Sequence, residues 1–248
     1  MKKLTVIIIT KNEEDVISDA VKSAKDIAEE ILVIDANSTD RTSEWASKLG
    51  AKVIKHQFRD FSDQRNFGFL HAKSPWILYL DADERLTNEF KSEVSKLIDS
   101  NNEAYAGFYI RRKTFYYGRD WNFIDRVQRL FLKDKFIEWF GVVHETPKVK
   151  GEFGEIKSPI IHLTHRNLSQ MLRKTNEWSE YEAKLRLASS HPKLVPWRFV
   201  RVMVTEFFNS YVKNKGYKNG TLGLIEGLYQ AFSIFITYAK LWEMQNKN

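Results

Sequence analysis

Short apolar runs alternate with helix-like segments along the first third of the chain. The runs have the length and the β-branched content of buried strands. They cover Thr5–Thr10, Glu30–Asp35, Lys52–Lys55 and Trp76–Leu80, and helical patterns follow the first three over about residues 16–24, 40–48 and 60–73. Ser38 or Thr39 is expected to cap the second of these helices. The alternation predicts the nucleotide-binding half of a doubly wound α/β sheet.

The fourth run ends in carboxylates. In the segment WILYLDADE, the apolar residues are followed at once by Asp81, Asp83 and Glu84. The carboxyl ends of the strands in such a sheet open onto the ligand-binding crevice. Asp81 and Asp83 therefore present two hard oxygen ligands, which suit a divalent cation that also holds a substrate's phosphates. An isolated Asp-x-Asp triplet is more often a solvated turn, so the prediction depends on the buried strand before it.

The glycine motifs that bind phosphates in two large enzyme classes are absent. No G-x-G-x-x-G follows the first strand, and no G-x-x-x-x-G-K-[ST] occurs in the chain. The sequence therefore disfavours dinucleotide-dependent oxidoreductases and P-loop kinases. Without a glycine loop, the phosphates of a bound nucleotide need a metal ion, and Mg²⁺ or Mn²⁺ is expected.

The last third of the chain has helical patterns. Apolar residues keep helical spacing from Leu168 to Leu187. In Thr221–Trp242 the polar residues form one narrow stripe on an otherwise apolar helix, namely Glu226, Gln230, Ser233, Thr237 and Lys240. At ~1.5 Å per residue, such a helix reaches about 33 Å, enough to cross a bilayer. The stripe favours a helix that lies at the membrane interface or packs on the preceding helix, and a dimer interface or ordinary core is the alternative.

The composition shows that the C-terminal part of the chain is basic. The 248 residues are 43% hydrophobic and carry a net charge of +7. Residues 191–248 hold 8 basic and 3 acidic residues, whereas residues 1–190 hold 31 and 29. The tail indicates an anionic partner surface, either a membrane leaflet or nucleic acid. The absence of cysteine excludes disulfides and thiolate metal sites, and no cleavable signal peptide is expected at the N-terminus.

Four motifs resemble, in order and spacing, those of the inverting glycosyltransferases of family 2, which have the GT-A fold. They are IIITKNEE, VIDANSTDRT, DQRNFG and LYLDADE. The later stretch RLFLKDKFIEWFGVVHETP and the basic C-terminal region look most like bacterial enzymes that add a hexose to the lipopolysaccharide inner core. The resemblance implies a catalytic domain over residues 1–165, divided into a nucleotide-binding half (1–84) and an acceptor half (85–165). A helical region for membrane association or dimerisation follows, over residues 166–248.

The resemblance also implies roles in nucleotide binding. Thr10 and Asn12 would contact the base and the ribose, although Asn12 could equally be a turn residue. Asp35 matches the carboxylate that accepts a hydrogen bond from the uracil imide N–H. Ser38 and Asp40 belong to the same loop, and one of the two is expected to serve only as a helix cap.

Further residues match positions near the diphosphate and the metal. Arg65 would lie near the diphosphate, with Asn66 as a weaker candidate beside it. Asp81 would contact the ribose or metal-bound water, and Asp83 would bind the metal directly. Arg126 and Arg129 could meet an acidic acceptor or the leaving diphosphate, with a surface salt bridge as the alternative.

Inverting glycosyl transfer needs a general base that deprotonates the acceptor hydroxyl. Glu145 is the candidate, because it stands in a loop between a glycine and a proline where the family places its base. Glu138 is the competitor, although strand alternation would point it to solvent. His144 could bind the metal or orient Glu145, and His162 is the alternative metal ligand or a satisfied strand histidine.

The expected function is metal-dependent transfer of a hexose from a nucleotide sugar, expected to be a UDP-sugar, to a lipid-linked glycan such as lipopolysaccharide core. The enzyme would be cytoplasmic and peripheral on the inner membrane, and a homo-oligomer remains open. A sugar nucleotidyltransferase is one alternative, but that class usually has a glycine-rich loop where this chain has TKNEED. A non-catalytic nucleic-acid-binding protein is the other, but the excess charge of residues 1–190 is only +2, so no nucleic acid is expected as a partner.

Overall fold

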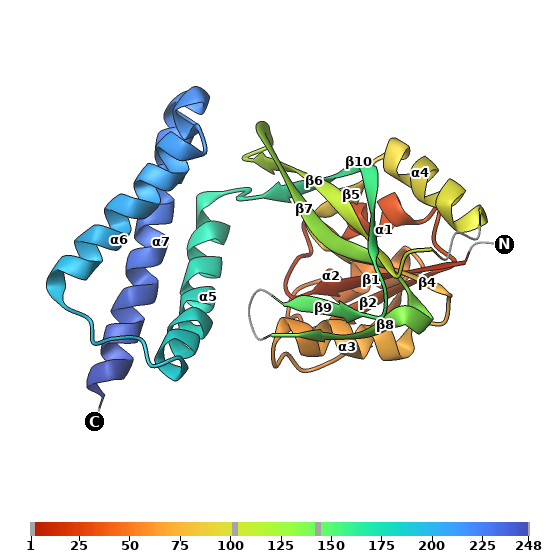
Figure 1. The fold of residues 1–248 in the computed structure, drawn as a ribbon, viewed down its shortest axis with the longest axis horizontal. Coiled ribbons are helices and arrows are strands. Elements are labelled where there is room, and N and C mark those ends of the chain that lie inside the picture. The colour runs from red at the N-terminus through yellow and green to blue at the C-terminus, as the bar shows by residue number, and fades with distance from the viewer. Residues whose placement is uncertain (1–2, 101–103, 142–144, 248) are drawn as a thin grey trace. The chain divides into compact units, whose positions relative to one another are not determined.

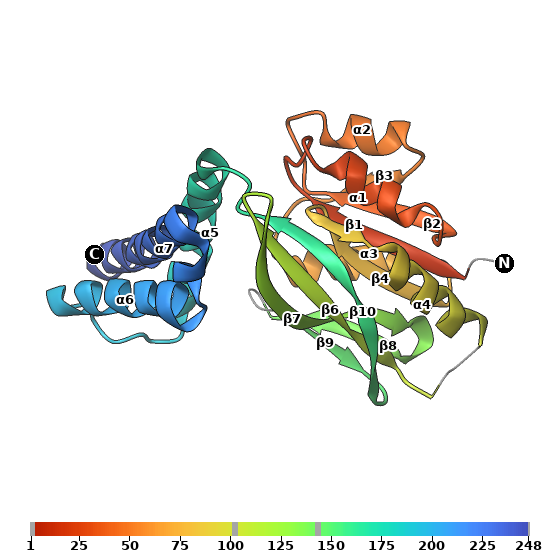
Figure 2. The ribbon, with the colours of Figure 1, turned by 90° about the horizontal axis from the view of Figure 1, so that it is seen from above.

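A computed structural model describes residues 3–100, 104–141 and 145–247. The chain forms two compact units, Met1–Thr164 and His165–Asn248, which Figures 1 and 2 show. The first unit contains all of the strands among the described residues, and the second is helical.

The described residues of the first unit form an eight-stranded mixed sheet, in the order β3-β2-β1-β4-β7-β6-β10-β5. The strands from β3 to β4 run parallel, and β7 joins β4 in the antiparallel direction. A separate antiparallel pair consists of β8 and β9. The strand bounds are β1 (Leu4–Thr10), β2 (Glu30–Asp35), β3 (Lys52–Lys55), β4 (Trp76–Asp81), β5 (Glu84–Leu86), β6 (Gly107–Tyr116), β7 (Arg119–Leu132), β8 (Phe136–Phe140), β9 (Thr146–Val149) and β10 (Phe153–Thr164). The four strands predicted for the nucleotide-binding half are present and parallel.

Helices cover both faces of this sheet. The core on one face includes residues of α1 (Ile17–Ala24), α2 (Thr42–Lys48) and α4 (Asn88–Asp99). The core on the other face includes residues of α3 (Phe61–His71) and of β8. The residues of β1 alternate between the two cores, because successive side chains of a strand point to opposite faces. The predicted α/β class with a mixed sheet and a helical extension is therefore confirmed.

Of the residues considered as a cap for α2, Asp40 is the one that bonds to its first turn. Asp40, and not Ser38 or Thr39, accepts hydrogen bonds from the backbone N–H of Thr42 at 3.0 Å and from its hydroxyl at 2.5 Å. The Ser38 hydroxyl instead donates to Asp35. Arg41 occupies the N-cap position without a side-chain capping bond, so Asp40 binds the first turn from one residue further back, whereas Ser38 is held at the end of β2.

α3 lies unusually close to the sheet. A Cβ atom added to Gly68 would stand 2.6 Å from the Ile7 side chain, which leaves no room for a larger residue. The glycine of the DQRNFG motif therefore permits the close packing. Its consequence is that the first turns of α3 reach the edge of the sheet where β4 ends.

The second unit consists of three long helices. They are α5 (Leu168–Ala188), α6 (Pro196–Phe208) and α7 (Gly220–Asn246), and the short turns Asn209–Lys213 and Gly216–Asn219 connect α6 to α7. α7 packs on α5 along one side and on α6 along the other (Figures 1 and 2). A small apolar core that includes Leu194, Val202 and Leu241 joins α6 to α7.

Candidate active site

Parallel strands bring polar side chains to one edge of the sheet. β1 lies between β2 and β4, with Thr10 beside Asp35 and Ile9 beside Asp81. The carboxyl ends of these strands share an edge because the strands run in the same direction. Two candidate carboxylates that are far apart in the sequence are thus separated by a single strand.

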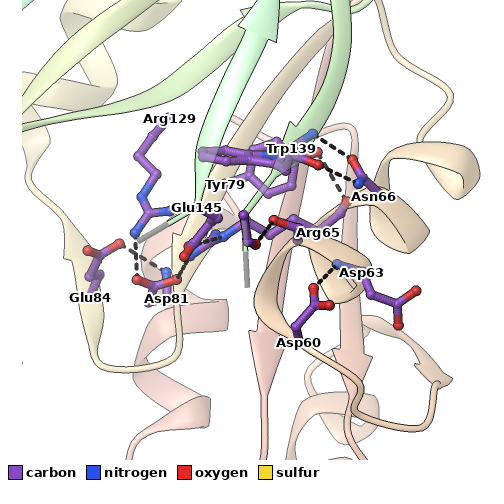
Figure 3. A network of polar contacts seen from close by, with 12 residues as sticks. Asp60, Asp63, Arg65, Asn66, Tyr79, Asp81, Glu84, Arg129, Trp139 and Glu145 are labelled. Carbon is purple, nitrogen blue, oxygen red and sulfur yellow. Dashed lines mark hydrogen bonds and ion pairs between the residues drawn. The ribbon is translucent and has the colours of Figure 1, made fainter. Parts of the chain in front are cut away.

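A buried arginine on α3 joins two carboxylates at this edge (Figure 3). Arg65 donates from Nη2 to Asp81 Oδ1 at 2.9 Å and from Nε to Glu145 Oε1 at 2.9 Å. Arg129 on β7 donates to the other oxygen of Asp81 at 2.8 Å. The Arg65 and Arg129 side chains are only 3% and 8% exposed. The structure therefore brings together four candidate residues from α3, β4, β7 and the segment before β9.

A β-bulge explains why Arg129 reaches the cluster and Arg126 does not. Phe108 pairs with Leu130 and Tyr109 pairs with Gln128, so Arg129 is the extra residue of β7. A bulge changes the direction of a side chain that regular alternation would fix. The Arg126 side chain is 57% exposed, and it lies 3.7 Å from Glu155. Arg126 therefore forms a surface salt bridge with Glu155, the alternative considered for it, and lies outside the cluster.

Two guanidinium groups control the charge of Asp81. Burial alone would raise the pKa of this carboxyl, but Arg129 and Arg65 more than offset burial and hold the pKa well below its usual range. Both carboxylate oxygens accept hydrogen bonds from arginine. In this arrangement Asp81 orients the two arginines and stays ionised across the physiological pH range.

Glu84 is a member of the site that the sequence left without a role. Its side chain is fully buried and accepts a hydrogen bond from the Asp81 backbone N–H at 2.9 Å. Arg112 lies 3.3 Å away. Burial, and then the nearby charge of Asp81, raise the pKa of Glu84. The glutamate fixes the turn that carries Asp83, and its place as the third acid of LYLDADE was the available signal.

Asp83 stands beside a histidine from β10. Its carboxylate Oδ2 is 3.6 Å from His162 Nε2, and both side chains are largely buried. Burial alone would lower the pKa of His162, but Asp83 more than offsets burial and raises the pKa above 6.5. The described residues contain no group of three or more potential metal ligands, and His144 lies outside them. An imidazole and a carboxylate still fit a divalent cation that takes its other ligands from a diphosphate and water.

α3 also holds the strand that leads to Glu145. The Asn66 amide donates to the Trp139 carbonyl at 2.8 Å and accepts from the Trp139 N–H at 2.8 Å (Figure 3). Ser62 donates to the carbonyl of Gly141. The amide of Asn66 is therefore engaged at both ends by backbone, and its role is to clamp β8. Sequence reasoning missed this clamp because the partner lies 73 positions away.

The loops after β1 and β2 are tied to each other. Asn12 accepts from the Thr39 N–H at 2.8 Å, and its own N–H donates to the Ser38 hydroxyl at 2.9 Å. Asn12 adopts a left-handed backbone with φ of 52°, which asparagine tolerates better than most residues. The turn role considered for Asn12 is thus present, and its polar side chain shapes the predicted nucleotide loop.

The Asp35 carboxylate has hydrogen-bond partners in the structure, whereas the Thr10 hydroxyl has none among the described residues. Asp35 is fully buried, and it accepts from the Ser38 N–H at 3.2 Å and from the Ser43 hydroxyl at 2.6 Å. The predicted contact between Asp35 and uracil stays a prediction, because the carboxylate is engaged by serines in this structure. The buried Thr10 hydroxyl has no hydrogen-bond partner among the described residues. Such an unpaired group is costly unless a ligand satisfies it.

Glu138, the competitor for the role of base, stands on β8 with a side chain 51% exposed and 3.9 Å from Lys148. This placement agrees with the solvent-facing position that strand alternation predicts. Glu145, in contrast, is 15% exposed and is bonded to Arg65 within the cluster. The geometry therefore separates the two glutamates.

The parallel strands and the charged cluster at their carboxyl ends form the ligand-binding edge of an α/β enzyme fold. The sequence pattern of glycosyl transferase family 2 matches residues 5–150, and the chain belongs to this family. The predicted GT-A fold and glycosyltransferase class are confirmed. Family membership decides against the nucleotidyltransferase and the non-catalytic nucleic-acid-binding alternatives.

Relatives cover almost the whole chain. An uncharacterized glycosyltransferase of Rickettsia typhi is 29% identical over 263 residues, which cover 100% of this chain and 89% of that protein. The lipopolysaccharide core biosynthesis glycosyltransferase LpsC of Rhizobium meliloti is 25% identical over 254 residues, which cover 97% and 92%. Among solved structures, glucosyl-3-phosphoglycerate synthase from Mycobacterium tuberculosis, in complex with Mn²⁺, UDP and glucosyl-3-phosphoglycerate, is 20% identical with a TM-score of 0.36, covering 46% and 44%.

Proposed function

We propose that this family 2 enzyme transfers a hexose, with inversion, from a UDP-sugar to a lipid-linked glycan such as lipopolysaccharide core. The observation that carries the catalytic part is the Arg65 bridge, which holds Glu145 beside Asp81 at the ligand-binding edge of the sheet. The similarity to LpsC supports the choice of acceptor.

Glu145 is suited to act as the general base. Arg65 occupies Oε1, and no other part of the chain that the structure describes bonds to Glu145, so Oε2 can accept the proton of the acceptor hydroxyl. The acceptor oxygen then forms a bond to the anomeric carbon as the bond from that carbon to the diphosphate breaks. The nucleoside diphosphate leaves with the electron pair, and the buried guanidinium groups of Arg65 and Arg129 lie at the same edge to stabilise its charge.

Asp83 and His162 are the residues that would hold Mg²⁺ or Mn²⁺ in this proposal. The Asp83 carboxylate faces Nε2 of the imidazole at 3.6 Å, so a cation between them would meet one oxygen and one nitrogen ligand. When bound, the cation would neutralise charge on the leaving diphosphate. The unpaired hydroxyl of Thr10 supports a donor site at the end of β1.

The test is release of UDP when the protein is mixed with UDP-sugars, Mn²⁺ and a lipid extract as acceptor. Glu145→Gln should lower the turnover rate by about 10²–10⁴-fold, the usual contribution of a general base. Glu138→Gln is the matched control and should leave the rate unchanged, because that side chain is exposed and outside the cluster. A fully active Glu145→Gln enzyme would refute the assignment of the base.

The donor is tested separately by thermal unfolding with nucleotide sugars. A ligand that binds only the folded protein raises the unfolding temperature. UDP-sugars should do so in the presence of Mn²⁺, and Asp83→Ala should remove the metal-dependent part of the shift. If only nucleotides other than UDP stabilise the protein, the choice of donor is wrong.

A further inference from the structure

The polar stripe of α7 faces the interior of the helical unit. Glu226 is 2% exposed and lies 2.9 Å from His165 Nδ1. The Tyr229 hydroxyl forms a 2.6 Å hydrogen bond with that of Thr175 on α5. Lys240 donates to a side-chain amide of α5 at 3.1 Å. Tyr229 and Lys240 of α7 therefore bind α5, and Glu226 binds His165 just before it.

The outward side of the same unit is apolar. Large apolar side chains that are at least two-fifths exposed recur at helical spacing along α6 and α7. They are Trp197, Val200, Val204 and Phe208 on α6, and Leu224, Leu228, Phe232 and Trp242 on α7. A helix of a soluble protein normally shows the reverse arrangement, with its polar face toward water. We call these eight residues the outer apolar surface. A surface of this kind usually marks an interaction site.

Cations accompany the outer apolar surface. Residues 189–225 contain six basic residues and one acidic residue. Arg201 stands 5.2 Å from the centre of the Trp197 ring, at the start of α6. Lys213, Lys215 and Lys218 are exposed in the connector at the other end of α6. Positive charge therefore lies at both ends of α6.

We propose that the outer apolar surface docks on an anionic lipid bilayer, with α6 and α7 lying in the membrane interface. Apolar side chains would enter the boundary between head groups and acyl chains, and the flanking lysines and arginines would meet anionic head groups. Tryptophan is enriched at that depth of a membrane. This inference concerns the helical unit and does not depend on the donor or the base proposed above.

An α7 helix that spans the membrane agrees less well with the contacts that this helix makes. The segment Gly216–Asn246 is long and apolar enough to cross a membrane, with 33% of its most apolar window buried within the protein. However, Glu226 and Lys240 anchor α7 to residues of α5 or next to it. α5 exposes charged residues such as Arg173, Glu177 and Lys184, which hydrocarbon would not accommodate. When α7 lies in the interface, its exposed apolar side chains contact lipid while the charged side chains of α5 stay in water.

A second copy of the chain is the other possible occupant of this surface. A two-fold dimer places the same patch of both copies together. The cation-rich segments 189–225 of the two copies would then lie close to each other and repel. An anionic bilayer instead attracts them, so charge complementarity favours lipid.

The experiment is flotation of the full-length protein with vesicles of phosphatidylcholine alone or mixed with phosphatidylglycerol. Binding should be strong only to the mixed vesicles. The double variant Val200→Asp, Val204→Asp should lower binding by at least about tenfold, because both exposed valines would carry charge into the interface. Leu70→Asp is the matched control, since Leu70 is 75% exposed on α3 of the catalytic unit, and it should bind like the unchanged protein.

A second set of variants changes only exposed lysines. Changing Lys213, Lys215 and Lys218 together to glutamine should lower binding to the mixed vesicles by about a hundredfold. The same change at Lys25, Lys73 and Lys96, which are exposed on the catalytic unit, is the control and should have little effect. Far-UV circular dichroism confirms the helix content of every variant.

Two results would overturn the proposal. One is the absence of flotation with anionic vesicles. The other is a dimer, detected by light scattering, that Val200→Asp, Val204→Asp dissociates while vesicle binding is unaffected. Binding of UDP-sugars, followed by thermal unfolding, should persist in all of these variants, so a failure here leaves the proposed glycosyl transfer to be judged by its own assays.

Discussion

Removal of the Arg65 guanidinium tests the cluster at the sheet edge most directly. Arg65→Met keeps an unbranched side chain of similar length and deletes the charge. Glu145 then loses its arginine partner, whereas Asp81 keeps Arg129 at 2.8 Å. Breaking a buried ion pair by removing one partner typically costs 3–5 kcal/mol. The lower end, about 3 kcal/mol, is expected because the Asp81 and Glu145 side chains retain 25% and 15% exposure, so water screens part of the charge.

The matched control is Arg126→Met. Arg126→Met makes the same chemical change on β7 of the same catalytic unit, but the Arg126 side chain is 57% exposed and lies 3.7 Å from its carboxylate partner. An exposed pair of this kind contributes about 0–1 kcal/mol. The two substitutions thus differ in burial and in the number of carboxylates that each arginine serves.

The assay is thermal unfolding of the full-length protein, followed by calorimetry so that the transition of the catalytic unit can be distinguished. A loss of about 3 kcal/mol should lower its midpoint by about 6–12 °C, at roughly 2–4 °C per kcal/mol for a domain of this size. Arg126→Met should lower it by no more than about 4 °C. Equal shifts for the two variants would show that the Arg65 bridge contributes nothing beyond a surface ion pair.

Three further predictions follow from the same region. Asn66→Ala should lower the unfolding free energy by about 1–3 kcal/mol, measured in urea, because two backbone groups of Trp139 lose their partner; an unchanged midpoint would count against the clamp. Gly68→Ala should cost about 1–3 kcal/mol in the same assay, since its Cβ would stand 2.6 Å from Ile7, and an unchanged midpoint would refute the close packing of α3 on the sheet. The lowered pKa of Asp81 contributes stability that is fully present above the pKa of an unfolded aspartate, about 3.9, and is lost as pH falls below it. Arg65→Met retains a smaller lowering of the Asp81 pKa, so its unfolding free energy should fall less than that of the unchanged protein as pH drops below about 3.9, and the gap between the two proteins should narrow; a gap that is constant with pH would contradict that origin.

The order of apolar and polar residues along the chain was enough to predict the strands and the edge of the sheet at which the site lies. Trp76–Leu80 had to be buried on both faces, so Asp81 had to stand at the end of a strand. The motif order and the glycine before Glu145 also identified the candidate base. The inferences about the strands and the edge succeeded because they use local periodicity and the direction of parallel strands, whereas the assignment of the base stays a prediction.

The partners of the site residues could not be read in the same way. Arg126 and Arg129 look alike in the sequence, and only the bulge in β7 sends Arg129 to Asp81. Asn66 looks like a polar neighbour of Arg65, yet it clamps Trp139. Each of these contacts joins positions far apart in the chain, and no local pattern specifies them.

The same division applies to the helical unit. The sequence by itself determined that α7 has one narrow polar stripe, because that depends only on 3.6-residue periodicity. Whether the stripe faces water or protein was decided by tertiary structure, since His165 supplies a partner for Glu226 and Thr175 of α5 donates to Ser233. A periodic pattern fixes which residues share a face of a helix, and only the packing of the neighbouring elements decides where that face points.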